Sequence, residues 1–257
     1  MKKTSDRIIY GIHAVIEALD AGKEFEKVLL KSGRGTSEYF TSLRNQLIDN
    51  KIPFQHVPVE KLNSITRKNH QGVIAYLSEI NYSEIEFILP QIFSEGRSPM
   101  ILVLDQVSDV RNFGAISRTA ECAGVDAIVI PFKGGARINA EAVKTSAGAL
   151  HSIPVCRHAD LRLLLDFLRN SGLKVVAATE KAERTIYQAD LTGPVAIVMG
   201  SEDRGISDAL FEFVDHRVSI PQYGQIGSLN VSVASGVMIY EVVRQRNAAS
   251  IRAESGD

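Results

Sequence analysis

Short apolar runs recur through the second part of the chain, and each has the length of a buried strand. Stretches with the spacing of amphipathic helices separate them. Apolar strands that alternate with helices are typical of a parallel sheet covered on both faces. The runs lie at Ile101–Leu104, Ala127–Ile130, Lys174–Ala178 and Val195–Val198. We therefore expect an α/β fold with a parallel sheet from Met100 onward.

The first 80 residues show a shorter alternation of the same kind. Val28–Leu30 and Val73–Leu77 read as strands, and Ala14–Leu19 has a helical pattern. Glycine and proline punctuate residues 81–98 around a short helical piece. The pattern predicts a small α/β domain over residues 1–80, a linker over 81–98, a larger α/β domain over 99–247 and a flexible tail over 248–257.

Composition agrees with this division. A chain of 257 residues with 45% hydrophobic residues can bury one or two ordinary cores. The apolar run after the polar start is too short for a secretory signal or a membrane span, so we expect a cytoplasmic protein. Cys122 and Cys156 lack CxxC spacing, and the six histidines form no paired-ligand pattern. We expect buried free thiols, no metal and no membrane partner.

Charge is distributed unevenly along the chain. The formal net charge is −1, which by itself would not hold a nucleic acid. Residues 1–80 carry 12 Lys and Arg against 9 Asp and Glu, a net charge of +3, whereas the remainder carries 17 against 21, a net charge of −4. Any contact with a polyanion must therefore be local.

Two polar loops follow apolar strands and precede helices near the end of the chain. One is the turn Gly200–Gly205, and the other runs from Ile220 to Asn230. Ligands bind beyond the carboxyl ends of strands in open α/β sheets, so these loops predict a shared pocket for a nucleotide-like ligand. The GxGxxG and GxxxxGK[ST] fingerprints are missing, which weakens a Rossmann-type methyltransferase or a nucleoside triphosphatase. Each loop alone also fits an ordinary helix cap.

Three stretches, Asn112–Ala120, Val198–Gly205 and Ile220–Ala234, resemble in order and spacing the signature motifs of the SpoU/TrmH family of RNA ribose 2′-O-methyltransferases. The resemblance covers about residues 99 to 246. Tyr10–Val15 and Asn69–Val73 are similar to the N-terminal extension of the large-subunit rRNA branch. The resemblance implies a ribosomal-protein-like RNA-binding domain followed by a SPOUT domain with a trefoil knot, which topology rules alone would not predict.

The reaction implied by the resemblance is methyl transfer from S-adenosylmethionine to a ribose 2′-hydroxyl. This reaction needs alignment, proton removal and stabilisation of the developing alkoxide. A guanidinium stays protonated, so the role expected of Arg118 is to hold a phosphate and stabilise the alkoxide. Glu202 either orients Arg118 or accepts a proton. The catalytic residues implied by the resemblance are Arg118, Asn112, Glu202, Ser228 and Asn230.

The same resemblance implies a cofactor site and two surfaces. Its residues for S-adenosylmethionine are Thr179, Gly200, Ile220, Leu229 and Ser228. The helix that starts near Val231 is rich in small and apolar residues, which fits either a core helix or the interface of a homodimer. Residues that could contact RNA phosphates or bases are Lys31, Arg34, Arg67, Lys68, His70, Gln71, Lys133–Arg137 and Lys144–Ala149.

The leading hypothesis is therefore an enzyme that methylates a guanosine ribose in the peptidyltransferase region of large-subunit (23S) rRNA. Its partner is the rRNA itself or a ribosome assembly intermediate. Two alternatives stay open: a non-catalytic RNA-binding assembly factor, and an rRNA adenosine 2′-O-methyltransferase that confers antibiotic resistance.

Overall fold

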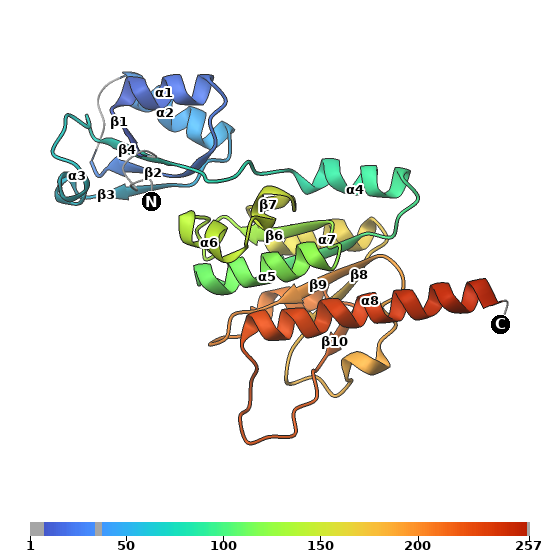
Figure 1. Ribbon diagram of the computed structural model, residues 1–257. Helices are drawn as coiled ribbons and strands as arrows, with labels where there is room; N and C mark the ends of the chain where they lie inside the picture. Colours follow the sequence, from blue (N-terminus) through green and yellow to red (C-terminus); the bar gives the residue numbers. More distant parts are fainter. Residues whose placement is uncertain (1–7, 34–37, 256–257) are drawn as a thin grey trace. The chain divides into compact units, whose positions relative to one another are not determined.

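The computed structural model describes residues 8–33 and 38–255 (Figure 1). The chain divides into two compact units, Met1–Asn81 and Tyr82–Asp257. Each unit has its own sheet and its own hydrophobic core.

The first unit is a four-stranded sheet with the order β1-β4-β2-β3. Its central strand β4 is antiparallel to β1 and β2, whereas β2 and β3 are parallel. The elements are β1 (Ile8–Tyr10), α1 (Ile12–Asp20), β2 (Phe25–Lys31), α2 (Glu38–Asp49), β3 (Phe54–Val57), α3 (Val59–Ile65) and β4 (Val73–Leu77).

Alternation along β2 divides the core of the first unit between the two faces of the sheet. Val28 and Leu30 pack with residues of α1 and α2 on one face. Leu29 packs with Leu62 of α3 on the other face. The unit is therefore a three-layer arrangement of helices, sheet and helix.

The second unit contains a six-stranded sheet with the order β10-β8-β9-β5-β6-β7, and all of its pairings are parallel. This arrangement confirms the predicted parallel α/β sheet. The strands are β5 (Met100–Leu104), β6 (Ala127–Pro131), β7 (Val155–His158), β8 (Lys174–Ala178), β9 (Val195–Met199) and β10 (His216–Val218). The helices are α4 (Ile85–Ser94), α5 (Val110–Cys122), α6 (Ala140–Thr145), α7 (Leu161–Asn170) and α8 (Val231–Ser255), with 3-10 turns η2 (Ala149–His151), η3 (Ile186–Gln188) and η4 (Asp208–Phe213).

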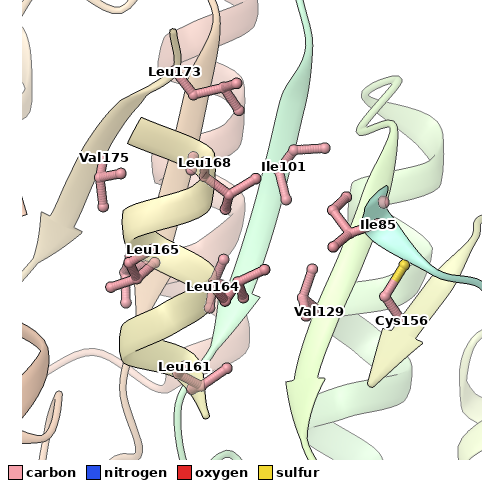
Figure 2. Close-up of a cluster of buried hydrophobic side chains, with 14 of the residues drawn as sticks. Ile85, Ile101, Val129, Cys156, Leu161, Leu164, Leu165, Leu168, Leu173 and Val175 are labelled. Carbon is pink, nitrogen blue, oxygen red and sulfur yellow. The ribbon is translucent and has the colours of Figure 1, made fainter. Parts of the chain in front are cut away.

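Helices cover both faces of this sheet. On one face, Leu164 and Leu168 of α7 pack against strand residues such as Ile101 and Val175 (Figure 2). α5 and α8 pack against each other on the opposite face, and α8 contacts β9 (Figure 1). The trefoil knot expected from the resemblance stays a prediction.

Two segments differ from the sequence-based expectations. The short helical piece expected within the linker over residues 81–98 is α4, but it belongs to the core of the second unit, where Ile85, Leu89 and Ile92 are buried. The reason is their helical spacing, which puts all three on one face. The tail expected from residue 248 is helical as far as Ser255, because no glycine or proline occurs in it before Gly256.

Candidate active site

The carboxyl ends of β10, β8 and β9 lie side by side, because these three strands are parallel neighbours. The loops that follow them and the start of α8 enclose a cavity of about 290 Å³. Its position is the one expected for a ligand site in a parallel sheet. The lining residues are Ala178, Thr179, Glu180, Lys181, Met199, Gly200, Ser201, Glu202, Asp203, Arg204, Gly205, Ile220, Gln222, Gly227, Ser228, Leu229, Val231 and Ala234.

Gly200 is required by the turn that follows β9. Ser201 and Gly205 exchange backbone hydrogen bonds of 3.1 and 2.9 Å, which close the turn tightly. A Cβ atom on Gly200 would lie 2.1 Å from the carbonyl carbon of Gly205. The resemblance implies that Gly200 belongs to the cofactor site. The structure adds a second reason for a glycine here, which is the close approach of the turn to its own backbone.

One carboxylate joins the three sequence motifs. Glu202 Oε1 accepts hydrogen bonds from Asn112 Nδ2 at 3.2 Å, from the backbone N–H of Val231 at 3.0 Å and from Asn230 Nδ2. Asn230 Nδ2 also donates to Asn112 Oδ1 at 3.1 Å. Residues that are 118 positions apart in sequence thus share one hydrogen-bond network, which we call the Glu202 network.

Helix caps leave the amide groups of the Glu202 network free for these contacts. Asp109 caps α5, because its Oδ1 accepts from the backbone N–H groups of Arg111 and Asn112 at 2.8 Å. Asn230 acts twice: its Oδ1 accepts from Ser232 N at the start of α8, while its Nδ2 reaches Glu202. The oxygen of Asn230 therefore acts as an ordinary helix cap, whereas its nitrogen belongs to the Glu202 network.

Arg118 stands apart from this network. It lies on α5 six residues after Asn112, which corresponds to a rise of about 9 Å and a different side of the helix. Its side chain is exposed, does not line the cavity and makes no hydrogen bond or ion pair with another residue that the structure describes. Arg111, on the same helix, instead donates from Nε to Glu141 Oε1 at 2.7 Å.

The five residues expected to hold the cofactor all line the cavity: Thr179, Gly200, Ile220, Ser228 and Leu229. Glu202 lines it as well, whereas Asn112 and Asn230 support Glu202 from outside the lining. The cavity is also lined by Lys181, Met199 and Ala234, which the sequence analysis did not assign to the cofactor site. Only their positions could have indicated this role: Lys181 lies three residues after β8, Met199 ends β9, and Ala234 lies one turn into α8.

Other expectations concern thiols, metals and the membrane. Cys156 is buried, and burial raises the pKa of its thiol to about 12, whereas Cys122 is exposed, contrary to the expectation of two buried thiols. Among residues 8–33 and 38–255, no three His, Cys, Asp or Glu side chains are grouped so that they could hold a metal ion. None of the helices in these ranges is long and apolar enough to cross a membrane.

Each of the two units matches a known protein family. Residues 99–240 match the SpoU rRNA Methylase family, and residues 8–83 match the RNA 2′-O ribose methyltransferase substrate-binding family. The chain is 39% identical over 244 residues to the 23S rRNA (guanosine-2′-O-)-methyltransferase RlmB of Photorhabdus laumondii, covering 94% of this chain and 99% of that protein. It is 38% identical to the RlmB of Haemophilus influenzae, covering 93% and 97% of the two chains.

Solved structures give the same result at the level of the fold. The AdoMet-bound rRNA methyltransferase of Sinorhizobium meliloti has a TM-score of 0.58 and 26% identity, and the match covers 93% of this chain and 87% of that one. A crystal structure of an RNA 2′-O ribose methyltransferase has a TM-score of 0.54 and 28% identity, with coverage of 93% and 88%. The family match, the two near-full-length relatives and the position of the cavity lead to one conclusion: this chain belongs to the SpoU rRNA methylase family.

Proposed function

We propose that the protein methylates the 2′-hydroxyl of a guanosine ribose in 23S rRNA with S-adenosylmethionine as the methyl donor. The observation that carries the proposal is the Glu202 network, which joins all three motifs at the cavity beyond β9. Two RlmB relatives of nearly the same length support the choice of substrate. A 23S rRNA substrate also fits the cytoplasmic location expected from the sequence.

The cavity has the chemistry that the donor requires. S-adenosylmethionine supplies an electrophilic methyl group on a positively charged sulfur. Ile220, Leu229 and Ala234 give the cavity an apolar wall that suits an adenine ring. Glu180 and Glu202 give it carboxylates that suit the sulfonium and ammonium groups, and Lys181 and Arg204 give it cations that suit the donor's carboxylate. The cavity volume of about 290 Å³ is at the lower end of the range for small-molecule sites.

Glu202 has a positioning role in this proposal. Its Oε1 receives three N–H donors, so the carboxylate fixes the start of α8 and the side chain of Asn230 relative to α5. Two roles were considered for Glu202. The first, orientation of Arg118 within the same chain, is not supported, because Glu202 and Arg118 form no hydrogen bond. Ser228, which lines the cavity, is left to contact the bound substrates.

Arg118 acts from a homodimer in this proposal. The exposed side of α8 carries Val233 and Tyr240, which are 52% and 50% exposed, and it continues into Leu229 at the cavity. An apolar stripe of this kind suits a two-fold interface. A second copy packed on it brings another set of side chains to the rim of the cavity. The resemblance assigns to Arg118 the role of stabilising the alkoxide and holding a phosphate, and we infer that the partner copy supplies it.

Free cations in the loop before α6 and in its last turn suit the path of the RNA backbone. Lys133, Arg137 and Lys144 are exposed and make no ion pair with the residues that the structure describes. Phosphate contacts of this type fix the register of RNA without reading its sequence. They supplement the substrate-binding role of the first unit.

The deciding experiment incubates the purified protein with labelled S-adenosylmethionine and unmodified 23S rRNA, then maps any alkali-resistant 2′-O-methylated position. Transfer to one guanosine supports the proposal. Transfer to an adenosine contradicts the choice of nucleotide. Absence of transfer to both the naked rRNA and a large-subunit assembly intermediate, despite cofactor binding, contradicts the enzyme assignment and favours an RNA-binding assembly factor.

The homodimer has a separate test in multi-angle light scattering. Tyr240→Glu places a charge in the middle of the α8 stripe, and Leu163→Glu places one on α7, where Leu163 is 66% exposed. The wild type and Leu163→Glu are expected to have the mass of two chains, and Tyr240→Glu that of one. A wild-type mass of one chain at micromolar concentration contradicts the homodimer.

A further inference from the structure

The first unit contains a second hollow, which we call the Lys31 hollow. It has a volume of about 450 Å³ and lies where β2 ends, between α3 and the loop before β4. Volumes of several hundred Å³ are typical of small-ligand sites. The lining residues are Lys31, Val59, Asn63, Lys68, Asn69, His70, Gln71 and Gly72.

The wall of this hollow is fixed by the buried ring of His70. His70 Nδ1 accepts a hydrogen bond from the backbone N–H of Gly72 at 3.0 Å, so the proton lies on Nε2, which donates to Asn63 Oδ1 at 2.9 Å. Gln71 has a φ of +52° and Gly72 a φ of +81°, both in the left-handed region. An uncommon turn that is held by a buried ring forms a preorganised wall.

The side chains of Gln71 and Asn63 leave donors free in this wall. Gln71 Oε1 accepts from the backbone N–H of Ile12 at 3.0 Å, and Asn63 Oδ1 accepts from His70. The amide nitrogens of Gln71 and Asn63 have no hydrogen-bond partner among the described residues. Both side chains therefore present N–H groups and no free amide oxygen, which suits a ligand rich in acceptors.

Two lysines give the same hollow a positive charge. Lys31 and Lys68 are exposed and make no ion pair with any residue in the described ranges, and Lys68 Nζ lies 5.5 Å from the centre of the Tyr10 ring. None of the described residues that line the hollow is acidic. Free ammonium groups beside free amide donors match a phosphate next to a base edge that carries acceptor atoms.

We propose that the Lys31 hollow binds one unstacked nucleotide of the substrate RNA. Lys31 and Lys68 contact its phosphate, and the amide N–H groups of Asn63 and Gln71 contact acceptor atoms on its base. The inference rests on the proposed function for the nature of the RNA, and it adds a defined nucleotide site that lies in the first unit, apart from the cavity beyond β9. Unstacked bases in loops are the usual targets of sequence-specific RNA recognition.

The test is the affinity of the full-length protein for a 23S rRNA fragment that contains the methylated position, measured by filter binding over a range of salt concentrations. Lys31→Gln with Lys68→Gln is expected to raise Kd about tenfold and to lower the slope of log K against log salt by about 0.7 for each lysine. Lys23→Gln with Lys51→Gln removes the same charge at the opposite end of β2 and β3 and is expected to change Kd less than about twofold.

A second variant tests the donor groups without disturbing the turn. Gln71→Glu keeps an oxygen for the N–H of Ile12 but replaces the free amide donors by a negative charge. It is expected to weaken RNA binding at least as much as the lysine pair while the thermal unfolding temperature stays the same. Gln71→Met removes the donors and the Ile12 contact together, so unfolding must be followed beside binding in that variant.

Binding is read separately from methyl transfer, which distinguishes failure of this inference from failure of the proposed function. Equal RNA affinity and an equal salt slope in the hollow variants and the control pair would overturn the nucleotide site, whatever the methylation result. Loss of affinity in the hollow variants of a protein that transfers no methyl group would support the site and contradict the enzyme assignment. If both hold, KM for RNA rises in the variants while kcat at saturating RNA stays within about twofold.

Discussion

The cavity beyond β9 and the Lys31 hollow leave different atoms free for a ligand. Side chains of both charges line the first, together with an apolar wall: Glu180, Glu202, Asp203, Lys181 and Arg204. Free amide N–H groups and two ammonium groups line the second. The first suits a compact ligand with an apolar ring and groups of both charges, and the second suits a polyanion. The difference shows how one chain separates donor binding from RNA binding. It also predicts that each can be weakened alone.

The largest effect that separates the two sites is expected for Arg118→Ala. Loss of a donor that stabilises a developing oxyanion lowers turnover by about 100- to 1,000-fold. S-adenosylmethionine affinity is expected to stay unchanged, because Arg118 does not line the cavity. Turnover and isothermal titration calorimetry measure the two effects. Arg169→Ala on α7 serves as the control, and unchanged turnover in Arg118→Ala would remove Arg118 from the catalytic set.

Gly200→Ala is expected to have the next largest effect, and it acts on the cavity alone. A Cβ atom 2.1 Å from Gly205 forces the turn to move, and a displacement of about 1 Å at a reacting site costs roughly 100-fold in rate. Gly193→Ala, at the other end of β9, meets no atom within 4 Å and is the matched control. RNA affinity should be the same in both variants. A loss of RNA affinity in Gly200→Ala would mean that the two sites are not independent.

Salt sharpens the comparison without a substitution. Raising the salt concentration from about 50 to 200 mM is expected to weaken RNA binding by about tenfold or more, because counterion release accompanies each phosphate contact. S-adenosylmethionine binding is expected to weaken less than about twofold, since that site is small and lined by both signs of charge. Parallel filter-binding and calorimetric titrations measure this. Equal salt dependence would contradict the assignment of the polyanion to the Lys31 hollow.

The sequence predicted the parts of the fold that depend on local pattern. The apolar runs at β5, β6, β8 and β9 gave the parallel sheet, because buried strands need apolar side chains on both faces. The short helix within residues 81–98 was expected, but its place in the core was not, because its polar flanks outweighed three apolar residues at helical spacing. Tertiary packing decides whether such a helix is buried, and here the core of the second unit provides the surface against which Ile85 packs.

The candidate site shows the same limit. The motifs supplied the identity of Glu202, Asn112 and Asn230, but no local pattern could show that one carboxylate oxygen joins all three, since the contacts span up to 118 residues. The reason for Gly200 also lay outside the pattern, in the backbone of Gly205. The free amide donors of the Lys31 hollow depend on which oxygens the fold already occupies, and only the structure provides that.

The smallest expected effect concerns how the two units begin their helices. α5, α6 and α7 of the second unit have side-chain caps from Asp109, Asn139 and Asp160, whereas α4 of the same unit and α1 and α3 of the first have none. Hydrogen bonds from the Arg162 side chain and backbone lower the pKa of Asp160 to about 2. Because this pKa is lowered in the folded state, the ionised Asp160 carboxylate stabilises the fold. This contribution is complete above about pH 4 and is lost as the pH falls toward 2.

Asp160→Asn keeps a good cap but removes this titration. The variant is expected to be slightly less stable than the wild type at pH 5, and the difference should shrink steadily between pH 4 and pH 2. Urea unfolding at several pH values measures it, with Asp49→Asn at the end of α2 as the control. The effect must be small because Asp160 and Arg162 are in contact with solvent, where water and salt screen their attraction. If the stability difference between wild type and variant instead grows on acidification, the carboxylate destabilises the start of α7. The side-chain cap of α7 would then not be a source of stability.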